Sequence, residues 1–538
     1  MYIKLIFYIF LFILIFINFS IGKKCKCPLK QTKNPLFHRR FKRGGNCSCG
    51  GGGGSTDDDN EGYTRRPGKE HVSEEMEVEQ TLLANILSTK YYVDMLVYSK
   101  PGGETVESEN FQIINVPINL GRGFDSIDEY RESVEYFSIG IYKEIITNQN
   151  GILDWLQRDE YDNFKKYDIG IAEFNGMAGS FAVFEALGIE ETFDVSCSIF
   201  HPTYLQFIGI NVLDYQVPEF KSAKPGDWEN GIWQKDREEN REEHEKSNTK
   251  LLQEFGKAKG LYKTLFRDKK IPKNTKKPST LDVLFNKIKY HFINQHPLIK
   301  FENFPEHEKF VYIGGIAVED HQLLTEGKQM VDNSEGAILE GERASLEDTD
   351  YVFTDLDNFK YNCVVLVAFG TINFAEVSIY KMIEEVFRHI PQCYFYVRSA
   401  KSSKYPNVHT SKNALPQKEI LSKTNTRVFI THCGQNSVIE SMYAGVPLIC
   451  IPMAGDQMYN ASIVESKGVG IYFDYKHLAH STDSLGNALY QILDIDEYGN
   501  FNFNSKYILA AEKMRRDILE NYDPETMKTM KDKFLDKF

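Results

Sequence analysis

A polar turn between a predicted strand and a predicted helix carries the side chains best suited to chemistry. Residues 429–440 read FITHCGQNSVIE, so a strand is predicted to end near Ile430 and a helix to begin near Ser437 and run to Tyr443. The first N–H groups of a helix have no intrahelical partner, and the helix dipole is positive at that end. The turn therefore predicts an anion site suited to a phosphate group.

Side chains around this turn add hydrogen-bonding groups. His432, Asn436 and Ser437 supply donors beside the predicted phosphate position. Glu440 lies one turn along the helix, where its carboxylate can accept from ribose hydroxyls. Each residue taken alone is more commonly ordinary turn chemistry, whereas their combination within one short segment indicates a nucleotide site.

A second polar loop follows the next predicted strand. That strand, residues 448–451, ends before Pro452, and Asp456 and Gln457 lie in the loop after it. A carboxylate beside an amide suits the vicinal hydroxyls of a sugar. The carboxyl ends of parallel strands meet at one edge of a sheet, so these residues are expected one strand end away from the phosphate turn.

The elements that must position these loops alternate between strand and helix along the chain. This alternation predicts two doubly wound α/β domains, with residues 221–280 as a helical excursion. Five cysteines lie in or next to predicted strands and are interpreted as buried free thiols. The predicted strands include residues 92–98, 111–117, 167–172, 310–313, 363–369, 393–397, 428–430 and 448–451, and the cysteines are Cys197, Cys363, Cys393, Cys433 and Cys450.

The segment from Phe429 to Ala461 resembles the signature of the UDP-glycosyltransferase family, which includes the animal UDP-glucuronosyltransferases. Residues 415–421 are similar to that family's Trp-Leu-Pro-Gln segment, and residues 367–371 to its Ser-Phe-Gly-Ser/Thr loop. The resemblance covers roughly residues 71–520 and is weakest before residue 165. The remaining similar segments are residues 294–298 and 312–316, and, as in nematode-like members, 171–173 and 184–189.

The resemblance implies a GT-B fold, in which two Rossmann-like domains face each other across a cleft. The C-terminal domain, residues 306–520, is then expected to bind the UDP-sugar, and the N-terminal domain, residues 71–305, the acceptor. His432 and Ser437 would contact the diphosphate with Thr371 and Asn436 nearby, Glu440 the ribose, Gln417 the uracil, and Asp456 and Gln457 the sugar hydroxyls. Neither a metal nor a cofactor is implied, because the helix N-terminus stabilises the leaving UDP, and the UDP-sugar is a co-substrate.

The catalytic residues depart from the family pattern. Glu173 stands where the family has its catalytic Asp, and His71 is the matching candidate for the base. The chain before His71 is polar over residues 63–70 and contains Pro67, so the family's first strand is either missing or degenerate. His71 is either the base or a solvated linker histidine. Ala414 replaces the family's uracil-stacking Trp, which removes a stacking surface.

The function predicted from the resemblance is transfer of a sugar, glucuronic acid or glucose, to a hydroxyl of a small lipophilic acceptor with inversion. One alternative is a UDP-sugar-binding protein with reduced or lost catalysis. A metal-dependent transferase is a second alternative, because Asp355 and Asp357, or Asp494 and Asp496, form Asp-x-Asp pairs. A nucleic-acid binder is disfavoured, because 76 acidic against 63 basic residues give a net charge of -13.

The two ends of the chain are predicted to lie outside the catalytic domains. Residues 1–22 combine a basic start with an apolar run and read as a cleaved signal peptide or a retained N-terminal anchor. Residues 23–70 read as a low-complexity linker, and residues 521–538 as a charged tail. The chain is therefore expected in the secretory pathway, in the endoplasmic reticulum lumen or membrane, or secreted if the leader is cleaved and nothing retains it. An uncleaved leader would associate the chain with the membrane through its N-terminus.

Overall fold

The computed structural model describes most of the chain from Glu74 onward, together with one N-terminal strand. The described residues are 12–18, 74–99, 108–120, 123–147, 151–157, 167–234, 238–267, 271–272, 275–326, 361–370, 383–399, 401–474, 482–496, 498–523 and 528–538. They divide into two compact units, Met1–Asp194 with Glu254–Lys289, and Val195–Gln253 with Tyr290–Phe538. The sequence analysis instead divided the chain near residue 305, so residues 195–253 and 290–305 fall in the other unit.

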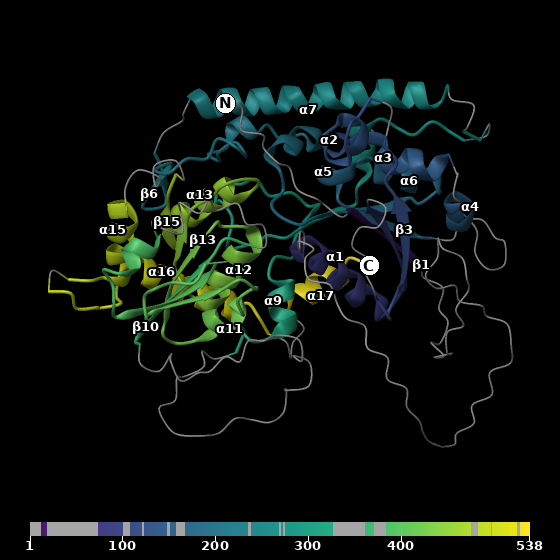
Figure 1. Cartoon of the computed structure of the whole chain (residues 1–538). Coiled ribbons are helices and arrows are strands. Elements are labelled where there is room, and N and C mark those ends of the chain that lie inside the picture. Colours follow the sequence, from purple (N-terminus) through teal and green to yellow (C-terminus); the bar gives the residue numbers. More distant parts are fainter. Residues whose placement is uncertain are drawn as a thin grey trace, which may run out of the picture. The chain divides into compact units, whose positions relative to one another are not determined.

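The first unit is an α/β unit whose strands lie in the order β3-β2-β1-β4-β5. Its strands are β1 (Phe12–Asn18), β2 (Tyr92–Ser99), β3 (Gln112–Pro117), β4 (Ile169–Ala172) and β5 (Glu191–Ser196). Its helices are α1 (Glu74–Ser88), α2 (Ile127–Arg131), α3 (Val134–Ile146), α4 (Ile152–Gln157), α5 (Phe174–Met177), α6 (Gly179–Ala186) and α8 (Leu281–Lys287). The long helix α7 (Glu238–Leu265), teal in Figure 1, gives residues to both units.

Strand β1 occupies a central position in this sheet and is antiparallel to both of its neighbours. It is antiparallel to β2 over seven residue pairs and to β4 over three, whereas β2 with β3, and β4 with β5, are parallel. The sequence analysis read the same residues as part of a leader and the first strand of the domain as missing or degenerate. In the structure, residues 12–18 form the strand between β2 and β4, and they run antiparallel to both of these strands. Whether residues 1–22 are cleaved stays a prediction.

The second unit contains a six-stranded parallel sheet in the order β12-β11-β10-β13-β14-β15, drawn in green in Figure 1. These strands are β10 (Cys363–Ala368), β11 (Cys393–Arg398), β12 (Val408–Ser411), β13 (Thr426–Thr431), β14 (Leu448–Cys450) and β15 (Gly470–Tyr472). The helices are α9 (Ile316–His321), α11 (Gln417–Ser422), α12 (Gln435–Ala444), α13 (Gln457–Ser466), α15 (Thr482–Leu493), α16 (Lys506–Glu520) and α17 (Met530–Leu535). The unit also holds η1 (Pro202–Ile208), η2 (Val212–Asp214), β6 (Trp228–Glu229), β7 (Ile232–Trp233), β8 (Tyr290–Ile293) and β9 (Phe310–Tyr312).

Hydrophobic patterning explains why β10 lies at the centre of this sheet. All six of its side chains are buried, as the continuous apolar run predicted for a strand covered on both faces. Alternate residues, such as Val365 and Val367, share one core cluster with Phe395 of β11 and Ile430 of β13. Apolar side chains of α15, such as Leu489, complete that cluster. The core therefore holds fixed the strand ends from which the predicted donor loops begin.

Two disulfides correct the interpretation of the strand cysteines as free thiols. Cys363 of β10 and Cys393 of β11 are partners in the parallel register, with Cα atoms 4.5 Å apart. Cys433, after β13, bonds Cys450 at the end of β14, with a Cα separation of 5.4 Å. Both separations lie in the range that a disulfide spans. For these four of the five cysteines the interpretation was wrong, because it treated each cysteine alone and did not consider which adjacent strands bring them together.

The C-terminal residues also differ from the expected charged tail. Helix α17 begins with a capping box, in which Thr529 and Asp532 exchange hydrogen bonds. Phe534 is fully buried, with its ring centroid 4.8 Å from that of Phe292. The Met530 N–H donates to Glu319 Oε2 at 2.6 Å. The charged pattern of the tail is therefore the exposed face of a packed amphipathic helix.

Within the part of the chain that the structure describes, none of the helices has both the length and the apolar character needed to span a bilayer.

Candidate functional site

The second sheet has a topological switch point between β10 and β13. The chain moves outward from β10 through β11 to β12, and then returns to lay β13 on the other side of β10. In sheets of this kind, ligands bind outside the carboxyl ends of the strands at such a point. The loop after β10 contains Gly370, and the loop after β13 contains His432. These two loops meet, so the predicted phosphate turn lies where the topology favours a ligand.

The His432 ring fits between two glycines. A Cβ added at Gly370 would lie 2.6 Å from His432 Nε2, and a Cβ added at Gly434 would lie 2.7 Å from the same atom. Gly370 also has a φ of 76°, a conformation that favours glycine, and its carbonyl accepts from Arg398 Nη1 at 2.6 Å. The glycines therefore allow the backbone to approach both sides of the imidazole, which fixes the position of the ring.

Burial also sets the charge of His432. The side chain is buried, and desolvation lowers its pKa to about 4, so the imidazole is neutral at pH 7 in the ligand-free protein. Its Nδ1 lies 3.2 Å from the hydroxyl of Thr431. A neutral imidazole can still donate one hydrogen bond to a phosphate oxygen, so the ring contributes a directed hydrogen bond rather than a fixed positive charge.

Helix α12 begins directly after this ring. Its N-cap is Gly434, which has no side chain to bond the first N–H groups. The N–H of Gln435, the first helical residue, hydrogen-bonds the Asp456 carboxylate, and the N–H groups of the next residues in this first turn are suited to an anionic ligand. The helix starts at Gln435, two residues earlier than predicted, and ends at Ala444. Ser437 is therefore the third helical residue, and its side chain is buried.

The start of α11 lies against α12. Gln417 Nε2 donates to Glu440 Oε2 at 2.7 Å and lies 3.5 Å from the hydroxyl of Ser437. Lys418 Nζ lies 3.9 Å from Glu440 Oε1. Burial raises the pKa of Glu440, while Lys418 and Gln417 act in the opposite direction. The structure thus brings together the residues assigned to uracil and ribose, with Glu440 oriented by two partners. Ala414, in place of the family's Trp, is exposed.

The loop after β14 carries the residues assigned to the sugar. Asp456 is the N-cap residue of α13, and its Oδ2 accepts from Asn460 Nδ2 at 2.9 Å and from Ser198 Oγ at 2.5 Å. Gln457 Oε1 accepts from the backbone N–H groups of Met453 and Ala454, at 2.8 Å and 3.0 Å. Both side chains are therefore held by their own surroundings, which presents a fixed carboxylate and amide.

Asn460 joins this loop to the phosphate turn. It is almost fully buried, and its Nδ2 donates both to Asp456 and to the carbonyl of Cys433, at 3.2 Å in the second case. Asn436, in the first turn of α12, accepts from Asn294 Nδ2 at 2.9 Å. The predicted diphosphate and sugar residues therefore belong to one hydrogen-bonded region.

Four contributors to this region were missed from the sequence: Ser198, Asn294, Lys418 and Asn460. Lys418 and Asn460 had a local signal, because Lys418 adjoins Gln417 and Asn460 lies four residues after Asp456 on a predicted helix. Asn294 begins a segment that resembles the family, residues 294–298, but nothing in the sequence connects it with Asn436. Ser198 had no local signal, because it reaches Asp456 from a distant part of the chain.

The catalytic pair is only partly described. Glu173 follows β4 at the N-cap position of α5 and is half-buried. The neighbouring Phe174 N–H donates to Asp194 Oδ1 at 2.8 Å. His71 and the donor residue Thr371 lie outside the described residues, so the roles assigned to them stay predictions.

Two other acidic groups were considered. Asp355 and Asp357 lie outside the described residues. In the other pair, the Asp496 carboxylate accepts from the N–H groups of Tyr498 and Asn500, at 2.9 Å and 2.8 Å, and so closes its own turn. This contact explains the second Asp-x-Asp pair as local turn chemistry.

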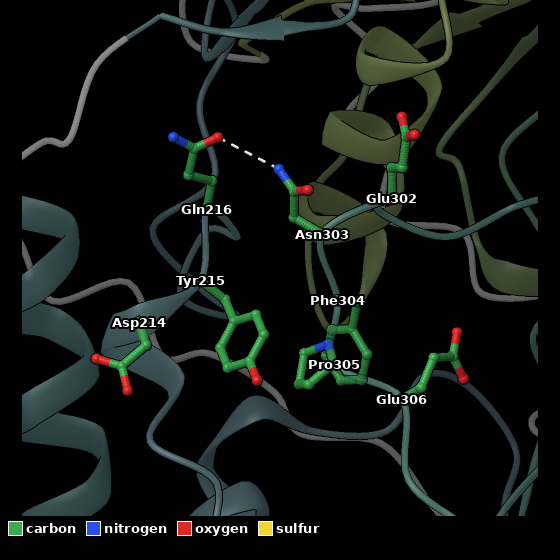
Figure 2. Close-up of a pocket in the computed structure, with 8 residues that line it drawn as sticks. All are labelled: Asp214, Tyr215, Gln216, Glu302, Asn303, Phe304, Pro305 and Glu306. Atoms are coloured by element: carbon green, nitrogen blue, oxygen red, sulfur yellow. Dashed lines mark hydrogen bonds between the residues drawn. The ribbon is translucent and has the colours of Figure 1, made fainter.

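A pocket of about 490 Å³ lies elsewhere in the second unit (Figure 2). Figure 2 shows Gln216 and Asn303 pointing toward each other, with a hydrogen bond of 3.2 Å between them. The residues that line this pocket are Asp214, Tyr215, Gln216, Glu302, Asn303, Phe304, Pro305 and Glu306. None of the predicted donor residues lines it, so we do not assign it to the donor.

The structure thus brings the predicted donor residues together at the switch point of a doubly wound sheet. Comparison with known proteins adds a family likeness. Residues 357–504 match the family model described as UDP-glucoronosyl and UDP-glucosyl transferase. Human UDP-glucuronosyltransferase 3A1 is 32% identical over 172 residues, which is 30% of this chain and 32% of the human protein. A Caenorhabditis briggsae protein whose name describes a UDP-glucuronosyltransferase is 36% identical over 146 residues, 25% of this chain and 27% of that protein. The chain spans about a third of the length of these relatives.

Among solved structures, a UDP-glucose: anthocyanidin 3-O-glucosyltransferase in complex with UDP is 16% identical, with a TM-score of 0.47 over 80% of this chain and 86% of that chain.

Residues 357–504 therefore carry the domain of the UDP-glycosyltransferase family, and the resemblance read from the sequence is confirmed. The predicted α/β fold class is also confirmed, because both units are α/β and the second contains a doubly wound parallel sheet. The strand order of the second unit is that of a complete Rossmann sheet, while the first unit departs from it through the direction of β1.

Proposed function

We propose that this protein is a UDP-glycosyltransferase that moves a sugar, glucuronic acid or glucose, from a UDP-sugar to a hydroxyl of a small lipophilic acceptor. The observation that carries the proposal is the His432 ring, fixed between Gly370 and Gly434 at the start of α12. That arrangement places a hydrogen-bond donor and a helix N-terminus side by side, as a diphosphate requires. The family match of residues 357–504 supports a UDP-linked donor.

Each part of the donor has residues suited to it. The N-terminus of α12, with His432 and Ser437, would hold the diphosphate, and Glu440 with Gln417 the nucleoside. In the proposed reaction, a base takes the proton of the acceptor hydroxyl, and the oxygen bonds to the anomeric carbon. The bond from that carbon to UDP breaks, UDP leaves with the electron pair, and the configuration inverts. The helix N-terminus stabilises the charge that develops on the leaving diphosphate, so the proposal includes no metal or cofactor.

Asp456 and Gln457 are proposed to bind the sugar. Replacing Asp456 with Ala is expected to reduce UDP-sugar turnover at least about tenfold, because a hydrogen bond to a charged group is worth about 1.5–3 kcal/mol. Replacing Gln457 with Ala should have a smaller effect, about two- to tenfold, because a neutral hydrogen bond is worth about 0.5–1.5 kcal/mol. UDP affinity should change little, since the sugar is absent from UDP. Titration calorimetry with UDP and a turnover assay with the UDP-sugar separate the two quantities. Equal losses of affinity for UDP and for the UDP-sugar would contradict the assignment.

His71 and Glu173 are proposed as the base and the carboxylate that orients it. Replacing either with Ala should lower turnover by about 10²-fold or more, the usual contribution of a general base, without changing UDP affinity. The assay is single-turnover transfer to a panel of phenolic and aliphatic alcohols. Turnover that survives both substitutions would place the base elsewhere in the chain.

A second candidate function, UDP-sugar binding with reduced or lost catalysis, is favoured by the direction of β1. Because β1 is antiparallel to β4, it ends near Ile169, at the start of β4, whereas Glu173 follows the end of β4. The family pattern has the catalytic His soon after the first strand, but a residue that directly followed β1 would leave the sheet at the edge opposite to Glu173. The proposed base, His71, is far from β1 in the sequence and follows a polar stretch, residues 63–70. Turnover with a UDP-sugar panel, after binding has been shown by thermal shift, distinguishes an enzyme from a binding protein.

We also propose that the chain enters the secretory pathway, in the endoplasmic reticulum lumen or membrane. The apolar N-terminal sequence supports entry, and the Cys363–Cys393 and Cys433–Cys450 disulfides suit an oxidising compartment. N-terminal sequencing of the protein from a secretory host, together with carbonate extraction, tests both cleavage and membrane association.

A further inference from the structure

We propose that Ser198 is a positioning residue of the donor site, which holds the Asp456 carboxylate in the orientation that grips a hydroxyl of the donor sugar. The inference rests on the proposed function, because Asp456 is assigned there to the sugar. Ser198 follows β5 and is half-buried, and its hydroxyl donates to Asp456 Oδ2 at 2.5 Å across 258 positions of sequence. The sequence analysis placed Ser198 in the acceptor domain, whereas the structure groups it with the donor-binding unit.

The Asp456 carboxylate is held by groups from different parts of the chain. Asn460 donates to Oδ2 from one turn further along α13, and Ser198 donates to the same oxygen from another part of the chain. A bond within one helix fixes the carboxylate relative to α13 only. The bond from Ser198 also fixes it relative to the loop that follows β5. Ser198 therefore adds a restraint from the loop after β5, beside those from Asn460 and from the Gln435 N–H at the start of α12.

The loop that carries Ser198 is itself built into the donor site. Ser196 Oγ donates to the carbonyl of Ile199 at 2.8 Å, which closes the loop. Asn294, almost fully buried, donates through Nδ2 to the carbonyl of Cys197 at 3.1 Å and to Asn436 Oδ1 at 2.9 Å. The same short loop is thus linked to a predicted sugar residue through Ser198 and to a predicted diphosphate residue through Asn294. These two links are independent observations.

The electrostatics of Asp456 provide a readout that a merely structural serine would not change. Burial raises the pKa of Asp456, and hydrogen bonds from Ser198, Asn460 and the backbone N–H groups of Asp456 and Gln435 lower it. None of these partners is charged. His432, in the loop after β13, is held neutral by burial, with a pKa of about 4. Removing the Ser198 hydroxyl takes away one of the hydrogen bonds that lower the pKa of Asp456, while burial still raises it. The pKa of Asp456 should therefore rise.

The rise in the pKa of Asp456 sets the direction in which the pH dependence of UDP-sugar binding should move. An ionised Asp456 accepts from the sugar hydroxyl, so UDP-sugar affinity falls as the pH falls through the pKa of Asp456. In Ser198→Ala this acid-side midpoint should move to higher pH, by about one unit for the loss of one hydrogen bond to a charged group. UDP, which has no sugar, should bind Ser198→Ala as it binds the wild type.

The experiment measures the dissociation constants of UDP-glucose, UDP-glucuronic acid and UDP between pH 4.5 and 8 by calorimetry on the full chain. The variants are Ser198→Ala, Ser198→Thr, which keeps a hydroxyl, and Ser466→Ala, which removes a hydroxyl that donates to the Ile463 carbonyl at the far end of α13. Comparing variants at the same pH cancels the ionisation of the ligands. Thermal unfolding midpoints show whether each variant is folded.

We expect the acid-side midpoint of UDP-sugar binding to rise in Ser198→Ala, to return toward the wild-type value in Ser198→Thr, and to stay at that value in Ser466→Ala. A wild-type midpoint and affinity in folded Ser198→Ala would overturn the inference, as would an equal shift in Ser466→Ala. If the folded wild type binds none of the three ligands, the proposed function itself fails, and the inference fails with it. The two failures are therefore distinguishable.

Discussion

Gly434→Ala is expected to weaken UDP binding by about 10- to 100-fold, because overpacking a close contact typically costs about 1–3 kcal/mol. The added Cβ would lie 2.7 Å from His432 Nε2 and 3.2 Å from Cε1. The ring cannot move away toward Gly370, because that backbone approaches the imidazole as closely from its own side. The phosphate turn must therefore shift. Calorimetric titration with UDP measures the effect.

A double-mutant cycle shows whether displacement of the His432 ring causes the loss of UDP affinity in Gly434→Ala. If Gly434→Ala acts by displacing His432, it should cost little further affinity in a His432→Ala background. The matched control is Gly486→Ala in helix α15, where an added Cβ meets no atom closer than 3.9 Å. That control should keep wild-type affinity. Additive losses in the cycle would mean that Gly434 matters for a reason other than the ring.

Removal of residues 1–22 should lower the free energy of unfolding by about 5 kcal/mol or more, a large part of the stability of an ordinary domain. The deletion takes out β1, which pairs with β2 over seven residues and with β4 over three. This magnitude follows because each of the backbone hydrogen bonds that β1 makes with β2 and β4 contributes about 0.5–1.5 kcal/mol net. Urea unfolding of the full chain and of a chain that starts at Lys23 provides the comparison.

A shorter deletion provides the control for this experiment. Removing residues 1–11 leaves all of β1 and should keep the unfolding midpoint of the full chain. Equal midpoints for the full chain and the chain from Lys23 would show that β1 is not needed in the folded sheet. That result would favour a leader that is cleaved before the protein functions.

The elements and side chains of the proposed donor site could be predicted from the sequence because their signals are local. A strand, a glycine-containing turn and a helix start fall within the residues around His432, and Gln417 and Glu440 lie at positions that the family signature marks. The contact between Gly370 and His432 follows from the strand order, once β10 and β13 are adjacent. The predicted helix start, near Ser437, was two residues too late, because the N-cap is Gly434 and the helix begins at Gln435.

The remaining features could not be read in this way, because they depend on contacts between distant segments. Ser198 reaches Asp456 only in the folded unit, and the Cys433–Cys450 bond requires that β13 and β14 be known neighbours. Residues 12–18 fit both a leader and a strand by composition, since an apolar run satisfies either. Their place between β2 and β4 depends on strand pairing that the sequence does not display.

The most direct test of the central claim, a UDP-sugar donor site at the carboxyl ends of β10 and β13, is a calorimetric titration of the full chain with UDP. The account predicts saturable binding by the wild type. It also predicts a loss of about 10- to 100-fold in folded His432→Ala, corresponding to one hydrogen bond to a charged phosphate. A folded wild type that does not bind UDP, or a His432→Ala variant that binds it unchanged, would contradict the account.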